Sequence, residues 1–188
     1  MAEYLDLLKK RRAVRDFEER DVPLETVQEI IRESCLAPSS MNGQTWRFII
    51  IMDRAVIRRL SDESKKNTLE DILKEPESPR RRLISSLQDE TFNVYYNAPC
   101  LVYIAGAGSA LRRIEDCSLA ACYFMFSAAA RGLGTCWIGL GQNIKAPDLR
   151  SIIGLPDDHE IVVPLILGYP KSIPAPPKRE PRILKIIT

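Results

Sequence analysis

Two short stretches of the sequence gather side chains that could bind a polar ligand. The first, "LAPSSMNGQTWRF", runs from Leu36 to Phe48. Pro38 disfavours helix at the residue before it, so a helix is expected to end near Ala37 and a loop to follow. This loop is either an ordinary polar turn or one that hydrogen-bonds the edge of a flat, polar ligand. Its small and amide residues are Ser39, Ser40, Asn42, Gly43 and Gln44.

The second stretch, "KKRRAVRDF", is basic, and three interpretations compete for it. It could form a phosphate site, because arginine offers phosphate oxygens a matched pair of donors. It could also be the solvated end of a helix or a nucleic-acid patch. Acidic residues follow at once and no aromatic residues interleave for base stacking, which argues against nucleic acid. The basic residues are Lys9, Lys10, Arg11, Arg12 and Arg15, and a second basic pair, Lys178 and Arg179, lies near the C-terminus.

Several common catalytic and cofactor sites find no support in the sequence. His159 is the single histidine and falls in "PDDHE", which predicts a solvated turn, so a histidine triad or a metal cluster is not expected. No G-x-S-x-G, Walker loop or H-E-x-x-H motif occurs. The stretch "GAGSAL" starting at Gly106 lacks a dinucleotide fingerprint, because Leu111 stands where the third glycine is required.

Composition predicts one domain, residues 1–188, in the cytoplasm. With 188 residues and 45% hydrophobic content, the chain can bury one core. The 27 basic and 25 acidic residues leave a net charge of +2, which gives no bulk attraction to nucleic acid or to an anionic membrane. No apolar run reaches the roughly 18 residues needed to cross a bilayer, and the N-terminus lacks a secretory pattern. Five cysteines without a C-x-x-C pair predict reduced core residues.

Apolar patterns predict alternating helices and strands that would position the two ligand-binding stretches. Helices are expected over residues 3–10, from Pro23 at a first helical position, after Asp53 as a cap, through Cys117 to Ala130 and from Ala146 to Ile153. The apolar runs "WRFIIIM", "APCLVYIAGAG", "GTCWIGL" and "EIVVPLILGYP" predict strands. This alternation favours an α+β or α/β class.

Two segments are harder to assign. Residues 61–97 are charged, carry Pro76 and Pro79 and lack apolar periodicity, which predicts partial helices in a mobile surface lid. The tail "APPKREPRILKIIT" has a proline-rich spacer and a β-prone end. Because such a tail does not readily fold back on its own core, residues 174–188 are expected to pair with a partner's sheet.

Four motifs, in order, resemble those of the FMN-dependent nitroreductases, in the compact form that includes the iodotyrosine-deiodinase-like enzymes. "RRAVRDF" resembles the basic opening motif R-R-S-x-R-x-F, and "APSSMNGQTWRF" resembles A-P-S-x-x-N-x-Q-P-W-x-F. "ARGLGTCWIG" resembles the central glycine-rich strand entry, and "GYP" followed by "KREP" resembles the closing motif. Ala13 replaces the usual serine, which removes a hydroxyl contact, and Thr45 replaces the usual proline.

This resemblance implies an α+β fold with a central mixed sheet flanked by helices, in a homodimer that exchanges C-terminal arms. It implies that Arg11, Arg12, Lys178 and Arg179 hold the phosphate of FMN and that the Ala13 backbone still serves. Arg15 would lie near the pyrimidine edge of the flavin. The resemblance places Ser39, Ser40, Asn42 and Gln44 at the phosphate, ribityl chain or flavin edge, and Trp137, Ile138 and Gly139 near the ring, with a backbone amide directed at flavin N5.

The function implied by the resemblance is an FMN-dependent oxidoreductase, reduced by NADH or NADPH, that passes electrons to a small-molecule acceptor such as a nitroaromatic, quinone or halophenol. Because the cofactor performs the redox chemistry, a catalytic dyad of protein side chains is not expected. The alternatives are a flavin-binding redox sensor or flavin carrier without turnover and, from the basic N-terminus, a nucleic-acid-binding module. Neither nucleic acid nor membrane is an expected partner.

Overall fold

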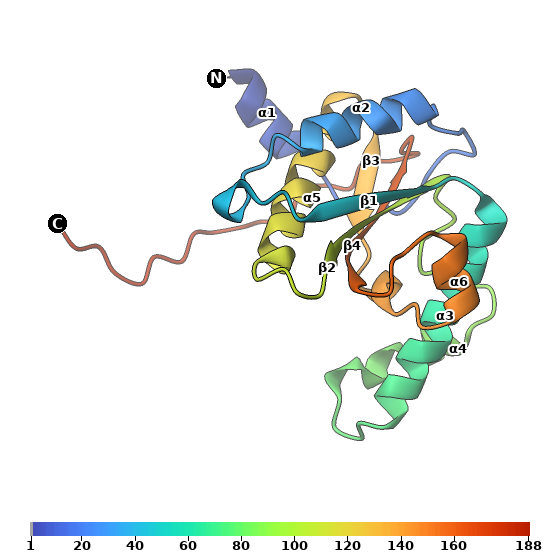
Figure 1. Ribbon diagram of the computed structural model, residues 1–188. Helices are drawn as coiled ribbons and strands as arrows, with labels where there is room; N and C mark the ends of the chain where they lie inside the picture. The colour runs from blue at the N-terminus through green and yellow to red at the C-terminus, as the bar shows by residue number, and fades with distance from the viewer. Residues whose placement is uncertain (1) are drawn as a thin grey trace.

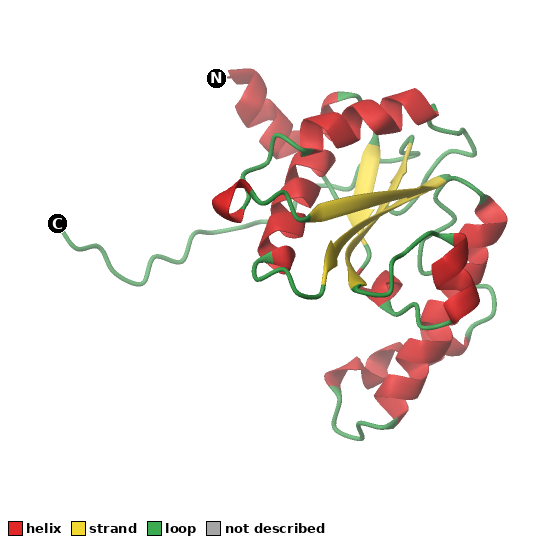
Figure 2. Ribbon diagram, in the orientation of Figure 1, coloured by secondary structure: helices red, strands yellow, loops and turns green. Residues whose placement is uncertain are grey.

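The computed structural model describes residues 2–188, with side chains described from Glu3 onward. A four-stranded sheet in the order β1-β2-β4-β3 forms its centre (Figure 2). The strands are β1 (Trp46–Ile51), β2 (Cys100–Ala107), β3 (Gly134–Trp137) and β4 (His159–Gly168). The α-helices are α1 (Ala2–Lys10), α2 (Leu24–Ser34), α3 (Arg54–Leu73), α4 (Ile84–Gln88), α5 (Arg113–Ala130) and α6 (Pro147–Ile152). The 3₁₀ turns are η1 (Ser40–Asn42), η2 (Pro79–Leu83) and η3 (Gly139–Gln142).

All three strand pairs are antiparallel, and β2 and β4 occupy the middle of the sheet. The predicted α+β class is therefore confirmed. A mixed sheet also contains parallel strand pairs. Among the described residues, the only parallel pairing is the isolated bridge between Ala13 and Thr135. All four runs predicted as strands form strands.

Each face of the sheet carries its own apolar core because side chains alternate along the strands. Leu101 and Tyr103 of β2 face the core that includes Leu60 of α3 and Leu149 of α6. The alternate residues of β2 face a second core built with α2 and α5, which includes Phe124. Figure 1 shows α2 and α5 on one side of the sheet and α3 and α6 on the other.

The segment 61–97 is more regular than its sequence predicted. Asp53 caps α3 as expected, accepting hydrogen bonds from the backbone N–H groups of Ala55 and Val56 at 2.8 and 3.1 Å. The helix then continues to Leu73 with buried polar side chains in its middle. Four of these side chains bond to other segments, so helix forms here without an apolar stripe; they are Ser61, Ser64, Lys65 and Asn67. The longest mostly exposed stretch of the segment is 73–82, and the mobility of the lid stays a prediction.

Three other expectations need correction. Pro23 is the N-cap of α2 and not its first helical residue. His159 does not lie in a solvated turn: it begins β4, and its side chain is 14% exposed, beside Asp158. The five cysteines are free as expected, but Cys35 is exposed. None of the described helices is long and apolar enough to span a membrane.

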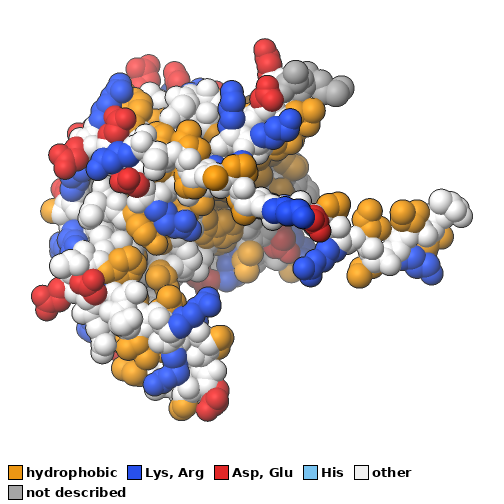
Figure 3. Space-filling model, turned by 180° about the vertical axis from the view of Figure 1, so that it is seen from behind, with side chains coloured by type: hydrophobic (Ala, Val, Ile, Leu, Met, Phe, Trp, Pro, Cys, Tyr) orange, Lys and Arg blue, Asp and Glu red, His pale blue; other side chains and the backbone are white. Residues whose placement is uncertain are grey.

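The C-terminal tail forms no helix or strand, and every residue of 171–188 is exposed. It leaves the body of the molecule as an extended segment (Figures 1 and 3). Ile183, Leu184, Ile186 and Ile187 are each 69% exposed or more. Apolar side chains gathered in this way on a free segment are typical of an interface.

Candidate functional site

The basic N-terminal motif lies alongside β3. The Val14 N–H donates to the Thr135 carbonyl at 2.9 Å, next to the Ala13–Thr135 bridge. Gly134 allows this approach, because a Cβ at that position would lie 2.8 Å from the Cβ of Val14. Burial raises the pKa of the Cys136 thiol, while the charges of Arg15 and Arg11 act to lower it. Both guanidinium groups therefore lie near enough to Cys136 for their charges to act on it.

A groove of about 570 Å³ opens where α1, the end of α5, the start of β3 and the root of the tail meet. Arg11 and Arg12 lie at this groove and are half-buried. Its other lining residues are Lys9, Lys10, Val14, Ala129, Ala130, Gly132, Leu133, Gly134, Thr135, Pro170, Ile173, Pro174, Ala175 and Pro176.

The arginines at the groove have spare hydrogen-bonding capacity. Arg12 Nη1 donates to the Arg11 carbonyl at 2.5 Å, but the buried Arg12 Nε has no hydrogen-bond partner among the described residues. Neither arginine forms an ion pair with a described carboxylate. A buried donor without a partner is costly, and a phosphate oxygen would satisfy it. The groove could therefore hold an anionic group such as a phosphate.

Arg15 extends the positive charge along β3, beyond the groove. It is exposed, and its guanidinium carbon lies 5.7 Å from the centre of the Tyr96 ring. No described carboxylate lies within ion-pair distance of it. Its charge is therefore not compensated within the chain.

The end of β3 leads into η3 and leaves a patch of open backbone. Trp137 is 38% exposed, whereas Ile138 is buried and its N–H donates to the Pro164 carbonyl at 2.9 Å. A Cβ at Gly139 would meet nothing within 4 Å. The following turn, η3, is held by the core, because the hydroxyl of the buried Tyr95 donates to the Gly141 carbonyl at 3.0 Å. A flat ligand could thus approach the chain at Gly139 without steric hindrance.

The polar loop of residues 39–44 folds around a carboxylate that the sequence did not single out. The buried Asp116, in the first turn of α5, accepts the Ser40 N–H at 2.9 Å and the Thr45 hydroxyl at 3.0 Å. Asn42 and Gln44 adopt positive φ values, of 55° and 47°, and both are exposed. An acid in the first turn of an otherwise apolar helix was the available signal for Asp116.

One chain does not bring all the candidate residues together. The loop 39–44 lies at the start of α5, by Asp116, whereas the groove lies at its end, by Ala129. Thirteen residues of helix separate these points, which is about 20 Å at 1.5 Å per residue. Lys178 and Arg179 lie in the exposed tail, where Lys178 pairs with Glu180 at 2.7 Å. The residues that do share one region are Arg11, Arg12, Ala13, Arg15, Trp137, Ile138 and Gly139.

Among residues 2–188, no group of three or more histidine, cysteine, aspartate or glutamate side chains is placed to hold a metal ion.

Comparison with known proteins gives a consistent result. The Nitroreductase family model matches residues 8–169. An iodotyrosine deiodinase of Thermotoga neapolitana is 31% identical over 175 residues, covering 88% of this chain and 87% of that protein. A protein of Archaeoglobus fulgidus named "Putative NADH dehydrogenase/NAD(P)H nitroreductase" is 27% identical, covering 92% and 88%.

Solved structures agree with the sequence matches. A nitroreductase of Bacteroides fragilis with bound FMN superimposes with a TM-score of 0.80 at 25% identity, covering 99% of this chain and 97% of that one. An iodotyrosine deiodinase bound to FMN and 3-iodo-L-tyrosine gives a TM-score of 0.71 at 29% identity, covering 98% of each chain. The family model spans most of the sequence and the structural matches span nearly all of it, so the chain belongs to the nitroreductase family.

Proposed function

We propose that this protein is an FMN-dependent oxidoreductase that is reduced by NADH or NADPH and transfers electrons to a small acceptor. The observation that carries the proposal is the groove at Arg11 and Arg12, where the buried Arg12 Nε has no hydrogen-bond partner among residues 2–188. The FMN bound in two similar structures supports the choice of ligand. Nitroaromatics, quinones and halophenols are the proposed acceptors, and the names of the relatives favour the first and the last.

Arg11 and Arg12 would bind the phosphate, and the chain beyond them would orient the ring. From the groove, the residues that follow Arg12 run along β3 towards Arg15 and Gly139. The N–H of Gly139 makes no hydrogen bond to another described residue, which leaves it free to donate to flavin N5. This run of backbone would set the position of the ring relative to its phosphate.

Bound FMN would supply the redox chemistry, taking two electrons from the nicotinamide nucleotide and passing them to the acceptor. Arg15 would present a fixed positive charge at the pyrimidine edge, where negative charge develops on reduction. Such a charge stabilises the reduced state and raises the midpoint potential. The protein's own residues thus bind, orient and tune the ring, and Trp137 would help to exclude water from it.

The complete site would require two copies of the chain. Ser39, Ser40, Asn42 and Gln44 lie in a loop at the start of α5, about 20 Å along the helix from its end at the groove, so a second subunit would supply them. An exchanged C-terminal arm would likewise bring Lys178 and Arg179 to the phosphate. A homodimer with two FMN sites at its interface meets both requirements.

The test begins with the purified protein. We expect it to retain FMN in preference to FAD or riboflavin, because the groove suits one terminal phosphate. Arg12→Ala should weaken FMN binding by about 10- to 150-fold, since one charge-assisted contact contributes about 1.5–3 kcal/mol. Arg32→Ala, which removes an exposed arginine of α2 outside the groove, is the matched control and should leave the affinity unchanged.

Turnover is tested by anaerobic mixing with NADH or NADPH and then with a panel of acceptors. Loss of the oxidised flavin absorbance, followed by its return when an acceptor is added, supports an oxidoreductase. Flavin that is retained but never reduced would overturn the enzyme assignment in favour of a flavin-binding sensor or carrier. Equal retention of FMN by Arg12→Ala and wild type would overturn the phosphate assignment.

A further inference from the structure

Tyr96 and Asn97 form an unusual backbone step just before β2. Their φ values are +54° and +53°, and both residues carry a side chain. Non-glycine residues rarely adopt this left-handed conformation, and a bulky aromatic residue does so at a cost in free energy. Such a conformation persists only where the surrounding structure holds it.

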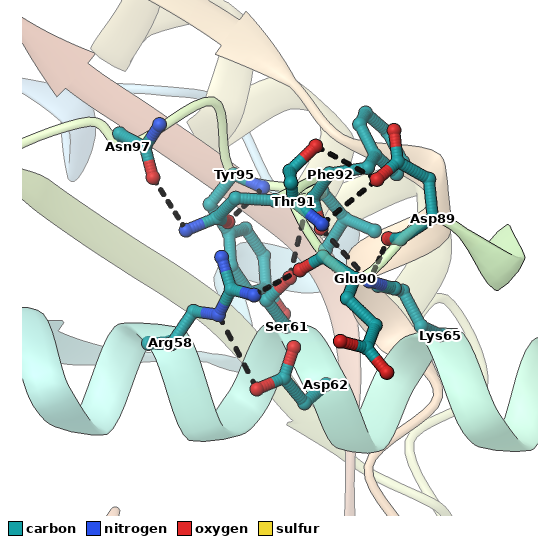
Figure 4. Close-up of polar contacts among 12 residues, drawn as sticks. Arg58, Ser61, Asp62, Lys65, Asp89, Glu90, Thr91, Phe92, Tyr95 and Asn97 are labelled. Carbon is teal, nitrogen blue, oxygen red and sulfur yellow. Dashed lines mark hydrogen bonds and ion pairs between the residues drawn. The ribbon is translucent and has the colours of Figure 1, made fainter. Parts of the chain in front are cut away.

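The loop that carries Tyr96 is fixed to α3 by buried polar contacts. Lys65 Nζ donates to the carbonyl of Phe92 at 3.0 Å and to that of Asp89 at 2.5 Å (Figure 4). The Ser61 hydroxyl accepts the Val94 N–H at 3.0 Å. These bonds account for two of the polar side chains buried in α3.

The step itself is closed by two further contacts. The side chain of Asn93 donates to Asn97 Oδ1 at 3.0 Å. The Phe92 ring meets the Tyr96 ring edge to face, with 6.1 Å between centroids and 86° between planes. The Tyr96 ring therefore packs against its own loop, which limits the positions open to it.

Tyr95 and Tyr96, at the start of this positive-φ backbone step, have side chains in different environments. Tyr95 is fully buried and its hydroxyl reaches the Gly141 carbonyl, under the turn that follows Gly139. Tyr96 is half-buried and its ring lies below the Arg15 guanidinium, at 5.7 Å. A guanidinium within about 6 Å of a ring centre is attracted to the ring face. Among residues 2–188, Arg15 has no other aromatic ring beneath its guanidinium and forms no ion pair with a carboxylate.

We propose that Tyr96 is a positioning residue for Arg15: the fixed ring holds the guanidinium over the end of β3, so that its charge acts on the flavin from one place. This inference rests on the proposed function, because it concerns a property of the bound flavin. An exposed arginine without a partner samples many rotamers, and its charge is then averaged and screened by water. Contact with the ring restricts the motion of the guanidinium and leaves its positive charge in place. A carboxylate partner would neutralise that charge.

The test measures the midpoint potential of bound FMN in a set of matched variants. Tyr96→Asn removes the ring and suits the backbone, because asparagine tolerates positive φ. Tyr96→Phe keeps the ring, and Arg15→Ala removes the charge. Tyr169→Asn is the matched control, because it removes a ring from Arg20, which is not a candidate site residue, where the guanidinium-to-ring distance is 3.9 Å.

We expect Arg15→Ala to lower the midpoint potential and Tyr96→Asn to lower it by at least half as much. Tyr96→Phe and Tyr169→Asn should leave it within error of wild type. The double variant Arg15→Ala/Tyr96→Asn should match Arg15→Ala alone, because Tyr96 acts through Arg15. A change in affinity for FMN alone, without a change in potential, would indicate a merely structural role and would overturn the inference.

Two other outcomes are also decisive. An effect of Tyr96→Asn that adds in full to that of Arg15→Ala would show that the ring acts independently of the arginine, contrary to the inference. If Tyr96→Asn fails to fold, Phe92→Leu replaces it, because it removes the contact that fixes the ring, and it should lower the potential in the same direction. Failure of the wild-type protein to bind FMN would instead overturn the proposed function, and this inference with it.

Discussion

The hydroxyl oxygens of Tyr95 and Tyr103 lie 2.7 Å apart in the core, where both residues are fully buried. Burial raises the pKa of each, so both hydroxyls stay neutral. The Tyr95 hydroxyl also donates to the Gly141 carbonyl, so this pair links β2 to the turn after Gly139.

This link predicts unequal effects of two similar substitutions. Tyr95→Phe should lower the free energy of unfolding by about 1–3 kcal/mol, because it leaves the Gly141 carbonyl and the Tyr103 hydroxyl without their partner. Tyr103→Phe should cost about 0.5–1.5 kcal/mol, since the Tyr95 hydroxyl keeps Gly141. Urea unfolding of the apoprotein measures both. Equal costs, or a larger cost for Tyr103→Phe, would contradict the direction of this link.

Two glycines of η3 offer a matched pair. A Cβ at Gly141 would lie 2.5 Å from Tyr95 Cε1 and 3.1 Å from Pro164 Cβ, so Gly141→Ala should destabilise the apoprotein by about 1–3 kcal/mol. Gly139→Ala meets open space and should change the stability by less than about 0.5 kcal/mol. It should nevertheless weaken FMN binding, because the added methyl group points into the proposed ring site. Unchanged FMN affinity in Gly139→Ala would remove Gly139 from that site.

The ends of α2 and α5 are joined by an ion pair whose effect depends on pH. Arg131 binds Glu33 through two nitrogens at 2.6 and 2.8 Å, and Ser127 donates to the same carboxylate at 2.6 Å. The hydrogen bonds from Arg131 and Ser127 lower the pKa of Glu33 from 4.5 to about 2. A lowered pKa stabilises the fold above pH 4.5, and this contribution is lost as the pH falls towards 2.

Glu33→Gln should therefore be less stable than wild type at pH 7. The difference should be no more than about 1 kcal/mol, because the Glu33 side chain is 45% exposed and solvent screens the pair. It should shrink steadily between pH 4.5 and pH 2. A difference that stays constant over this range would show that the carboxylate charge is not its source.

The C-terminal arm is predicted to serve both assembly and cofactor binding. Truncation after Pro174 removes two residues that line the groove, the basic pair and the exposed apolar end. We expect the truncated chain to be monomeric by light scattering and to lose FMN. The double variant Lys178→Ala/Arg179→Ala is the control: it should remain dimeric while its FMN affinity falls. A truncated chain that stays dimeric and retains FMN would contradict the prediction.

Within the predicted lid, residues 61–97, buried and exposed parts are expected to differ in mobility. Residues 61–72 and 93–95 contain buried side chains, whereas 73–82 lies at the surface. Amide hydrogen exchange should therefore be fast in the exposed part and slow in α3 up to Ile72. Binding of an acceptor analogue to the holoprotein should slow exchange in 73–82, as expected of a lid. Strong protection of 73–82 without a ligand would argue against mobility.

Local signals predicted most of the fold. The apolar runs at Trp46 and Cys100 and the cap at Asp53 each depend on a few adjacent residues, and all three form as expected. The length of α3 was missed because Ser61 and Lys65 are buried through bonds to residues some 24 to 33 positions away. No periodic pattern records such bonds. His159 was wrongly predicted to lie in a turn because its neighbours Asp158 and Glu160 are polar, whereas the apolar run of the strand begins only at Ile161.

The candidate site was only partly predictable for the same reason. Arg12 and Arg15 could be identified as candidates because the charge and donor geometry of arginine indicate phosphate binding from the residue type alone. The contact between Arg15 and Tyr96 joins residues 81 positions apart. No sequence pattern near either residue predicts that contact. The separation of the polar loop from the groove likewise depends on the position of α5 in the fold. The residues of the two motifs do not predict that position.

The separation of these two binding elements along α5 has a consequence for the protein in dilute solution. If each FMN contacts the groove of one chain and the loop of another, flavin binding and association of the chains are linked equilibria. Flavin should then be lost on dilution of the unmodified protein, and added FMN should shift the association to lower protein concentrations. The same linkage makes bound flavin a reporter of assembly, so a titration of protein concentration at fixed FMN would give, from absorbance, the apparent association constant at that FMN concentration.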